Sequence, residues 1–318
     1  MALNTFSIVV GAVSIAVLSA FGGSARAQGA WVNDPKSLTA NLQYQYVPSS
    51  SVVLSPTESQ NDRPTVNHLV TLGLEYVLVE NLALNLEVPF AAIKYSGDPV
   101  HAQHLPKGKW DDGKFHYTPE DLRFGVRYQV LDEPILAVTP YAAVSLPMTN
   151  YETIGFATGG RNLRAAHFGV AFGRTFTPYL PRLFFQAGYE LTLAQSFDAN
   201  ADTKKIGQSR SDVDATVGYA FLDGDLVVDL AANFRAQHDG VEFTDFPKKN
   251  ADGTPKVPFD DQLFHDAILK EQYTFFGGDV SYALTTKFSV DLSVRFFYQG
   301  YNTRDQSLYG LNFSWRAL

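Results

Sequence analysis

The stretch "LRFGVRYQVL" (residues 122–131) alternates apolar and polar side chains with the period of an extended strand. Leu122 and Phe124 fall on one face of such a strand, whereas Arg123 and Arg127 fall on the other. One face would therefore be apolar and the other would carry two guanidinium groups. Such a strand fits a half-buried soluble sheet or the wall of a membrane barrel, and the rest of the chain distinguishes between them.

The same alternation recurs along most of the chain. It is clear in "VTLGLEYVLV" (70–79), "LALNLEVPF" (82–90), "LFFQAGYELTL" (183–193) and "FSVDLSVRFFY" (288–298). The expected strands are 38–47, 66–79, 82–94, 120–131, 134–146, 164–177, 181–196, 209–222, 225–237, 270–284, 287–299 and 304–316. Most are longer than the 5–6 residues usual in soluble sheets. Strands of about 10 residues are what a tilted crossing of the hydrocarbon layer requires.

The connections between these segments alternate in length. Short, turn-rich connections fall at 79–81, 131–134, 177–181, 222–225 and 284–287. Long ones fall at 48–65, 95–119, 147–163, 197–208 and 238–269, and only 300–303 breaks the pattern. All long loops would then leave the same end of the sheet. We therefore expect a transmembrane antiparallel up-and-down β-barrel of about 12 strands, with short periplasmic turns and long extracellular loops.

The polar face of these strands carries many charges. Its expected members are Glu75, Glu87, Arg123, Arg127, His167, Glu190, Asp212, Asp214, Asp229, Arg235, Asp279, Asp291 and Arg295. A single Arg or Lys at the midplane of the lipid face costs about 2–4 kcal/mol. A dozen or so charges there would exceed the stability of a typical domain, about 5–15 kcal/mol. The polar face must line the lumen, where it selects solutes or fills the interior with mutually paired charges.

A soluble sandwich or small barrel also alternates, with its apolar face inward. Aromatic residues near strand ends favour the membrane barrel, because girdles at the two interfaces are aromatic. They are Tyr76, Phe90, Tyr95, Phe124, Tyr128, Tyr179, Phe185, Tyr298 and Trp315. The final segment, "LYGLNFSWRAL" (308–318), is similar to the C-terminal assembly signal of bacterial outer-membrane proteins. The barrel assembly machinery is accordingly an expected partner, as are outer-membrane lipid and lipopolysaccharide.

The N-terminus reads as a signal peptide. An apolar core, "FSIVVGAVSIAVLSAF" (6–21), precedes an A-x-A pattern that ends at Ala27. We expect residues 1–27 to be the signal peptide and residues 28–318 to form one barrel domain in the bacterial outer membrane. About ten residues separate Gln28 from the first strand, so we expect no N-terminal plug. The chain has no cysteine, and its net charge of -8 excludes nucleic acid as a partner.

Three segments carry a family resemblance: "GLEYVLVENLALNLEVPF" (73–90), "EDLRFGVRYQVLDEP" (120–134) and "GGDVSYALTTKFSVDLSVRFFYQGYNT" (277–303). With "AAVSLPMTNYETIGFATGGRNLRAAHFGVAFG" (142–173), they resemble the MetA-pathway phenol-degradation family of outer-membrane proteins. The resemblance covers most of residues 66–316. It implies a transport-like role, with aromatic or other hydrophobic compounds as candidate solutes.

No motif predicts an enzyme, a cofactor or a metal site. Neither H-x-S nor G-x-S-x-G occurs, and His68 and His167 lack a flanking serine pattern. The loop 245–266 contains Asp245, Asp252, Asp260, Asp261 and Asp266, but their spacing fits no EF-hand. It is best interpreted as a solvated loop rather than a calcium site.

The segment "GFATGGRN" (155–162) has the glycines of a phosphate loop without its Lys-Ser/Thr. It predicts a loop at the mouth of the barrel, with Arg161 and Arg164 near the aperture. The expected function is an outer-membrane channel for passive uptake of small solutes, including aromatic or hydrophobic compounds. The alternative is a closed structural or adhesive barrel whose lumen is filled by charges.

Overall fold

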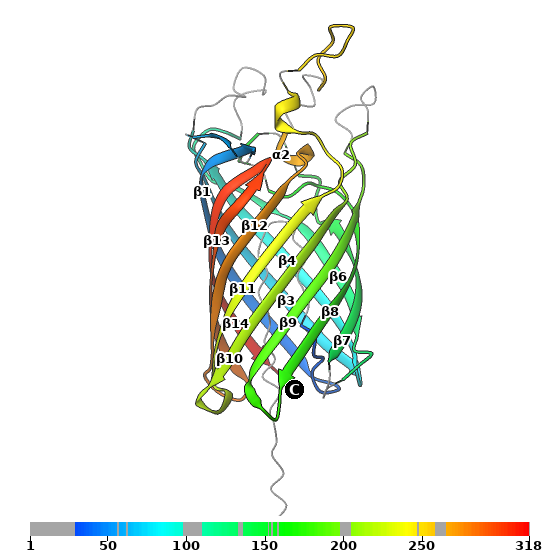
Figure 1. Cartoon of the computed structure of the whole chain (residues 1–318), viewed down its shortest axis with the longest axis vertical. Coiled ribbons are helices and arrows are strands. Elements are labelled where there is room, and N and C mark those ends of the chain that lie inside the picture. The colour runs from blue at the N-terminus through cyan, green and yellow to red at the C-terminus, as the bar shows by residue number, and fades with distance from the viewer. Residues whose placement is uncertain are drawn as a thin grey trace, which may run out of the picture.

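The computed structural model describes residues 29–55, 57–61, 63–97, 110–132, 136–151, 153, 155–157, 159–197, 205–246, 248–257 and 265–317. They form a closed antiparallel barrel of 12 long strands, as the alternation predicts (Figure 1). The expected signal peptide lies outside the described residues, so its cleavage stays a prediction. Among the described residues, no helix is long and apolar enough to span a membrane.

The wall strands follow one another around the barrel in chain order. They are β1 (Leu38–Ser55), β3 (Thr65–Val79), β4 (Leu82–Tyr95), β6 (Asp121–Tyr128), β7 (Ala137–Pro147), β8 (Ala165–Phe176), β9 (Leu180–Ala194), β10 (Arg210–Phe221), β11 (Leu226–Gln237), β12 (Gln272–Ala283), β13 (Phe288–Tyr301) and β14 (Thr303–Arg316). β1 extends beyond its expected end because a bulge between Ser49 and Val52 bends it along the rim. Two short strands were not predicted: β2 (Glu58–Gln60) on β1 and β5 (His116–Pro119) on β4.

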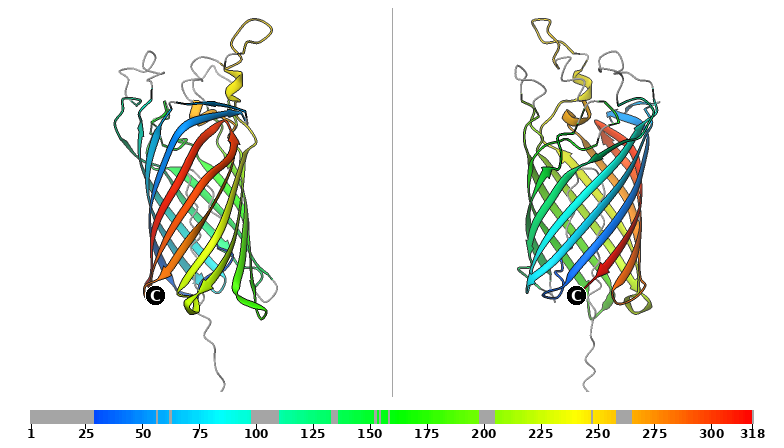
Figure 2. Two further views of the ribbon diagram at one scale, coloured as in Figure 1. Left: turned by 60° about the vertical axis from the view of Figure 1, so that its left-hand side comes forward. Right: turned by 180° about the vertical axis from the view of Figure 1, so that it is seen from behind.

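The barrel closes through its first and last strands. β1 pairs antiparallel with β14, with Thr39 opposite Arg316 and Tyr46 opposite Tyr309 (Figure 2). Closure satisfies the backbone groups that an open sheet edge would leave without partners, which is the condition for a sheet to cross lipid.

The outward phase of the strands is apolar and exposed. Leu230, Leu292 and Phe313 keep 74%, 56% and 50% of their surface exposed, and only lipid can cover a continuous belt of this kind. Seven of the nine aromatic residues expected at strand ends lie on this outer face, at least partly exposed, and Tyr179 is exposed in the turn between β8 and β9. Tyr95 was placed wrongly. It is fully buried inside the barrel, because it continues the inward phase of Glu87, Ala91 and Ile93 on β4.

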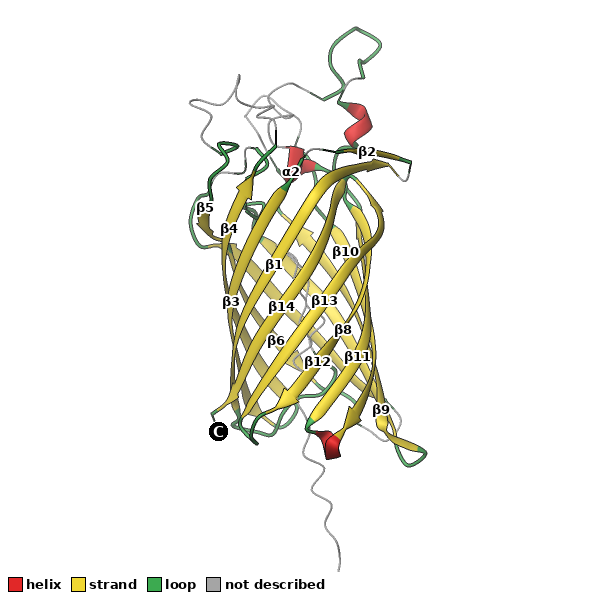
Figure 3. Ribbon diagram, turned by 90° about the vertical axis from the view of Figure 1, so that its left-hand side faces the viewer, coloured by secondary structure: helices red, strands yellow, loops and turns green. Residues whose placement is uncertain are grey.

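The two ends of the barrel differ, as the loop lengths predict. β2, β5 and the short helix α2 (His265–Ile268) lie at the end from which the long loops leave (Figure 3). Short turns close the opposite end, where a 3-10 turn, η1 (Leu222–Gly224), joins β10 to β11. The second 3-10 turn, η2 (Phe243–Asp245), belongs to a long loop. We call these ends extracellular and periplasmic, in the orientation usual for such barrels.

The residues that precede β1 enter the periplasmic end of the lumen, which corrects the expectation that they are too few to fill it. Arg127 donates to the Gly29 carbonyl and Thr139 to the Ala30 carbonyl. The backbone N–H groups of Ala30 and Val32 donate to the side chains of Gln186 and Gln129, at 3.3 and 2.8 Å.

Trp31 packs where a side chain on Gly173 would otherwise lie. Six residues span at most about 20 Å, and a segment of that length reaches the wall side chains that narrow the lumen from several sides. Residues 29–34 are called the N-terminal segment below.

Candidate functional site

The structure places all thirteen predicted lumen residues on the inward phase of the wall. Nine are buried: Arg123, Arg127, His167, Glu190, Asp229, Arg235, Asp279, Asp291 and Arg295. Glu75, Glu87, Asp212 and Asp214 are half-buried. Their action on a solute stays a prediction, but their contacts with one another define the interior.

One ion pair crosses the inside of the barrel. The Arg123 guanidinium on β6 donates to Glu190 on β9, with Nη2 2.6 Å from Oε2, across the two intervening strands. Both side chains are nearly inaccessible, so each charge is stabilised by the other rather than by water. A contact of this length between non-adjacent strands narrows the lumen at this level.

A second pair ties the wall to the N-terminal segment. Arg127 on β6 lies 2.7 Å from Glu75 on β3, and Asn85 donates to the same carboxylate at 2.8 Å. Asn33 donates to the other carboxylate oxygen at 3.1 Å. The N-terminal segment is therefore held by the same charges that pair across the wall.

The opposite side of the lumen holds two more groups of paired charges. Asp212 on β10 accepts from Arg235 at 2.6 Å and lies 3.4 Å from Arg210. Arg295 on β13 forms two hydrogen bonds with Asp279 on β12, at 2.6 and 2.9 Å. Two hydrogen bonds from one guanidinium fix its orientation as well as its position.

Glycines show how tightly this region is packed. A Cβ on Gly169 would collide with the Tyr141 ring, and one on Gly218 would collide with the Phe184 ring. Both rings point into the lumen, and both glycines provide the space that they fill. At Gly169 and Gly218 the inward side chains of neighbouring strands are therefore closely packed.

The inner wall near the extracellular ends of β1, β3, β4 and β14 is different, and the sequence analysis missed it. This part of the wall is apolar and is built by Val47 on β1, Leu69 on β3, Ala91 and Ile93 on β4, and Leu308 on β14. Trp110 and Phe243 of the long loops pack against this wall. A signal was present in the sequence, because Leu69, Ala91 and Ile93 occupy the phase that polar residues hold elsewhere on β3 and β4.

The predicted mouth loop packs against this apolar wall. Phe156 and Ala157 are 5% and 1% exposed and belong to the same apolar cluster, in which Phe156 stacks on Tyr95 with ring centroids 4.7 Å apart. The Asp111 carboxylate accepts hydrogen bonds from the backbone N–H groups of both residues, at 2.9 and 3.1 Å. The Tyr151 hydroxyl donates to Asp121 at 2.6 Å.

Arg161 holds the far end of the mouth loop. Its guanidinium donates to Gln208, Gln237 and Glu271, each at 2.8 Å, so one side chain joins the approaches to β10 and β12 and the end of β11. Arg164 does not accompany it: Arg164 is exposed, whereas Leu163 is buried with Phe197 and Ile268. Arg164 contributes its backbone carbonyl, which accepts from the Gln195 N–H at 2.8 Å.

Two acids of the extracellular loops titrate away from their usual range. Burial raises the pKa of Glu120, between β5 and β6, to about 7, and the neighbouring Asp121 charge adds to the effect. A Cβ on Gly159 would lie 2.9 Å from the Glu120 carboxylate, so this acid touches the mouth loop. By contrast, desolvation is the largest single effect on Asp245, but the hydrogen bonds and charges of Lys248 and Lys256 together outweigh it and lower the pKa of Asp245.

The acidic loop shows no cation cage in its described part. Asp245 forms ion pairs with Lys248 and Lys256, and Asp252 accepts from Thr254. Asp260 and Asp261 lie outside the described residues, and of Asp266 only the backbone is described. In the described part of the chain, no three His, Asp or Glu side chains gather in a way that could hold a metal ion.

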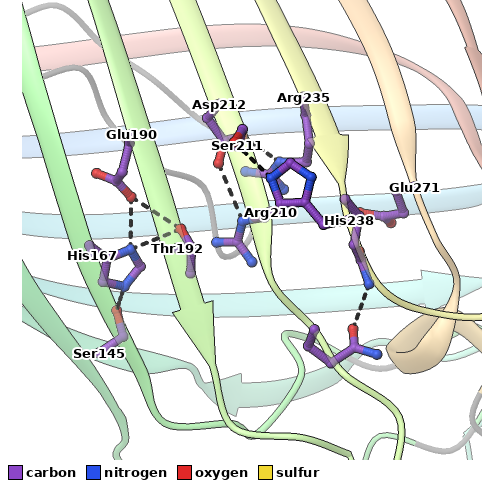
Figure 4. A network of polar contacts seen from close by, with 12 residues as sticks. Ser145, His167, Glu190, Thr192, Arg210, Ser211, Asp212, Arg235, His238 and Glu271 are labelled. Atoms are coloured by element: carbon purple, nitrogen blue, oxygen red, sulfur yellow. Dashed lines mark hydrogen bonds and ion pairs between the residues drawn. The ribbon is translucent and has the colours of Figure 1, made fainter.

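Two serine–histidine contacts also escaped the sequence analysis, because they form between strands rather than within a motif. Ser145 lies 2.8 Å from His167, whose second ring nitrogen lies 2.7 Å from Glu190 (Figure 4). Ser211 lies 2.8 Å from His238 on the outer face. Alternation predicts which face a residue occupies, but contacts across strands depend on register, which the sequence did not reveal.

No protein-family model and no curated protein matches this sequence. Among solved structures, an outer membrane channel from Pseudomonas putida F1 superposes with a TM-score of 0.67 at 14% identity, over 90% of this chain and 97% of that one. The NanC porin is similar with a TM-score of 0.47 at 9% identity, over 87% and 98% of the two chains. The CymD monoaromatic hydrocarbon channel gives 0.42 at 11%, over 88% of each.

The first of these likenesses shows the fold, which is that of a bacterial outer-membrane barrel. The apolar belt and the closed wall place the chain in that membrane, surrounded by its lipid. The resemblance to the MetA-pathway phenol-degradation family stays a prediction.

Proposed function

We propose that the chain is an outer-membrane channel that takes up small apolar solutes, aromatic compounds among them. The observation that carries this proposal is the apolar inner wall near the extracellular ends of β1, β3, β4 and β14, formed by Val47, Leu69, Ile93 and Leu308. A pore for hydrophilic solutes needs polar groups along its surface. An apolar surface inside a barrel, covered by loop side chains that a solute can displace, is suited to hold a solute that water solvates poorly.

The polar network serves this function by closing the lumen to water and ions. The Arg123–Glu190 pair crosses the lumen on the side of β6 to β9, and the N-terminal segment occupies the periplasmic end. The thirteen predicted lumen residues thus act as a barrier whose rearrangement admits the solute, rather than as the lining of an open pore.

A second candidate function rests on the same network. If the pairs never separate, the chain is a closed structural or adhesive barrel whose extracellular loops bind partners. The buried charge pairs and the mouth loop anchored by Asp111 and Arg161 favour this reading. Binding of a solute at the apolar wall distinguishes the two candidate functions.

The chain offers a reporter for such binding. It has three tryptophans, of which Trp110 packs on the apolar wall, Trp31 lies in the N-terminal segment and Trp315 faces outward. In the double variant Trp31→Phe and Trp315→Phe, Trp110 is the single emitter. Bromobenzene, a heavy-atom quencher, should reduce its emission in a saturable manner in the detergent-folded protein.

Benzene provides the control, because it competes for the same wall without quenching. If bromobenzene binds at a specific site on the wall, benzene should restore the Trp110 emission and glucose should have no effect. Quenching that rises linearly with bromobenzene and does not respond to benzene would instead be micellar partition, and the channel proposal would fail. The variant Ile93→Asp, which charges the wall, should remove saturation if it folds.

Assembly in the membrane is assigned to the last strand. Tyr309, Phe313 and Trp315 of β14 are exposed on the outer face, and β14 seals the barrel against β1. Recognition of this strand by the barrel assembly machinery predicts that replacing Phe313 and Trp315 by serine reduces the folded fraction in cells, while refolding in detergent is affected less. Lipopolysaccharide is assigned to the exposed extracellular rim of the same belt.

A further inference from the structure

Three side chains on three consecutive strands make a linear polar chain inside the barrel. The Ser145 hydroxyl on β7 lies 2.8 Å from Nε2 of His167 on β8. Nδ1 of the same ring lies 2.7 Å from Oε1 of Glu190 on β9 (Figure 4). The order of atoms, hydroxyl to Nε2 and Nδ1 to carboxylate, is the arrangement by which a histidine acts as base toward a serine.

The carboxylate determines which ring nitrogen carries the proton. Because Glu190 is an acceptor, the ring presents its N–H at Nδ1 and its lone pair at Nε2, toward Ser145. Thr192 lies 3.2 Å from Nδ1 and 3.4 Å from the Glu190 carboxylate, which limits rotation of both groups. The imidazole is therefore held in the tautomer that can accept the serine proton.

The site is placed where a molecule from outside would arrive. Ser145 is two residues from the extracellular end of β7, and His167 is two residues from the start of β8. His167 and Glu190 are 2% and 1% exposed, whereas Ser145 is only partly buried. The acid and the base are thus shielded, and the hydroxyl is the member of the set that faces accessible space.

A positive charge stands beside the hydroxyl. Arg123 lies directly opposite Ser145 in the β6–β7 register, and such partners have Cβ atoms about 4.5–5.5 Å apart. Its two Nη atoms bind Glu190, and among the described residues its Nε has no hydrogen-bond partner although it is buried. A guanidinium at this distance can stabilise negative charge that develops on a carbonyl oxygen bonded to Ser145.

We propose that Ser145, His167 and Glu190 form a serine-hydrolase site at the mouth of the lumen, which cleaves small uncharged carboxylic esters. Ser145 Oγ bonds to the ester carbonyl carbon while His167 Nε2 takes the hydroxyl proton. The carbon–oxygen bond to the alcohol then breaks, and His167 returns the proton to the leaving alcohol. Water cleaves the acyl-serine by the same route and releases the acid, so one ester and one water give one acid and one alcohol. This activity does not depend on whether the lumen conducts.

The outer face supplies a comparison within the same molecule. Ser211 lies 2.8 Å from Nε2 of His238, and Tyr189 lies 3.0 Å from the same hydroxyl. Within the described part of the chain, no carboxylate hydrogen bond to Nδ1 of His238 is found, and the ring is exposed. Ser211 therefore has a histidine neighbour but no carboxylate partner for that histidine, and it lies outside the lumen. It is the matched control for Ser145.

The test is covalent labelling of the folded full chain by a fluorophosphonate, which reacts with serines that have an activating base. We expect one phosphonyl adduct, located on Ser145 by peptide mass mapping, and hydrolysis of 4-nitrophenyl acetate above the rate of Ser145→Ala. His167→Ala should lower both rates about 10²–10⁴-fold, the usual contribution of a positioned general base. Ser211→Ala should change neither.

Glu190 is a positioning residue, so its variant needs a readout beyond rate. Glu190→Gln should reduce labelling and change its pH profile, because the amide does not stabilise the imidazolium that forms during attack. Folding of each variant is checked by heat-modifiable migration. The proposal is overturned if the folded wild type carries no adduct on Ser145 and hydrolyses the ester no faster than Ser145→Ala, or if the adduct forms on Ser211 instead.

Discussion

Two regions of the lumen are built by strands of the same barrel but have different inner surfaces. Near the extracellular ends of β1, β3, β4 and β14 the inward phase is apolar, and loop residues such as Phe156 pack on it. Elsewhere the inward phase is charged: Arg127–Glu75 and the N-terminal segment occupy the periplasmic end, and Arg123–Glu190 extends the charged region toward the mouth on β6 and β9. The difference shows that alternation determines which face a residue occupies, whereas the chemistry of the inner face varies from one part of the wall to another.

The difference also assigns separate tasks to the two regions. An apolar wall can exchange loop side chains for an apolar solute at little cost, because both make similar dispersion contacts. A buried charge that loses its partner has no such replacement. The apolar wall is thus suited to binding, and the charged region to closure.

The largest effect is expected from removing charges of the polar network. In the double variant Arg123→Ala and Arg127→Ala, Glu190 and Glu75 lose their arginine partners, at about 3–5 kcal/mol for each buried pair. We expect a lower thermal midpoint in heat-modifiability assays and, if current flows, reversal potentials shifted toward cations. Arg174→Ala is the control, since Arg174 is an exposed arginine on β8 that stacks on Phe176. Unchanged reversal potentials in a conducting variant would make the arginines simple filling.

A smaller effect is expected from removing a loop side chain that covers the apolar wall. Phe156→Ala removes a buried ring from the apolar wall, a change that costs about 3–5 kcal/mol in well-packed cores and less where a loop can collapse. The mouth loop should then be cleaved faster by added protease, and bromobenzene should quench Trp110 more strongly at low concentration. Phe168→Ala, on the lipid face, is the matched control. Equal cleavage of both variants would show that the ring does not anchor the loop.

The smallest effect concerns pH. The pKa of Glu120 is raised to about 7 by burial, so the folded state favours its protonated form. Its contribution to stability is fully present below the unfolded pKa and is lost as pH rises through about 7. Proteolysis of the mouth loop should therefore become faster as the pH rises from about 4.5, the ordinary pKa of this carboxyl, to about 7, and level off above it, and Glu120→Gln should abolish the dependence. An unchanged pH profile in Glu120→Gln would assign the effect to another group.

The sequence predicted the barrel because its signal is repeated in every strand. It also placed residues such as Arg123 and Asp291 on the correct face, since a period of two leaves only two choices. It did not predict the N-terminal segment, because residues 29–34 have no periodicity and are held only by distant side chains such as Gln186. Tyr95 and the apolar wall were missed because averaging over a strand hides a change of inner chemistry near its end. The Ser145–His167–Glu190 chain needed the register of three strands.

The division of the lumen is tested most directly by single-channel recording in planar bilayers, comparing the full barrel with a variant refolded without residues 29–34. The account predicts small or absent conductance steps for the full barrel and larger, steady ohmic steps once the N-terminal segment is gone, because the packed polar network then loses the chain held by Gln129, Gln186 and Thr139. Large steps of equal size from both proteins would contradict it, since the lumen would then be an open aqueous pore.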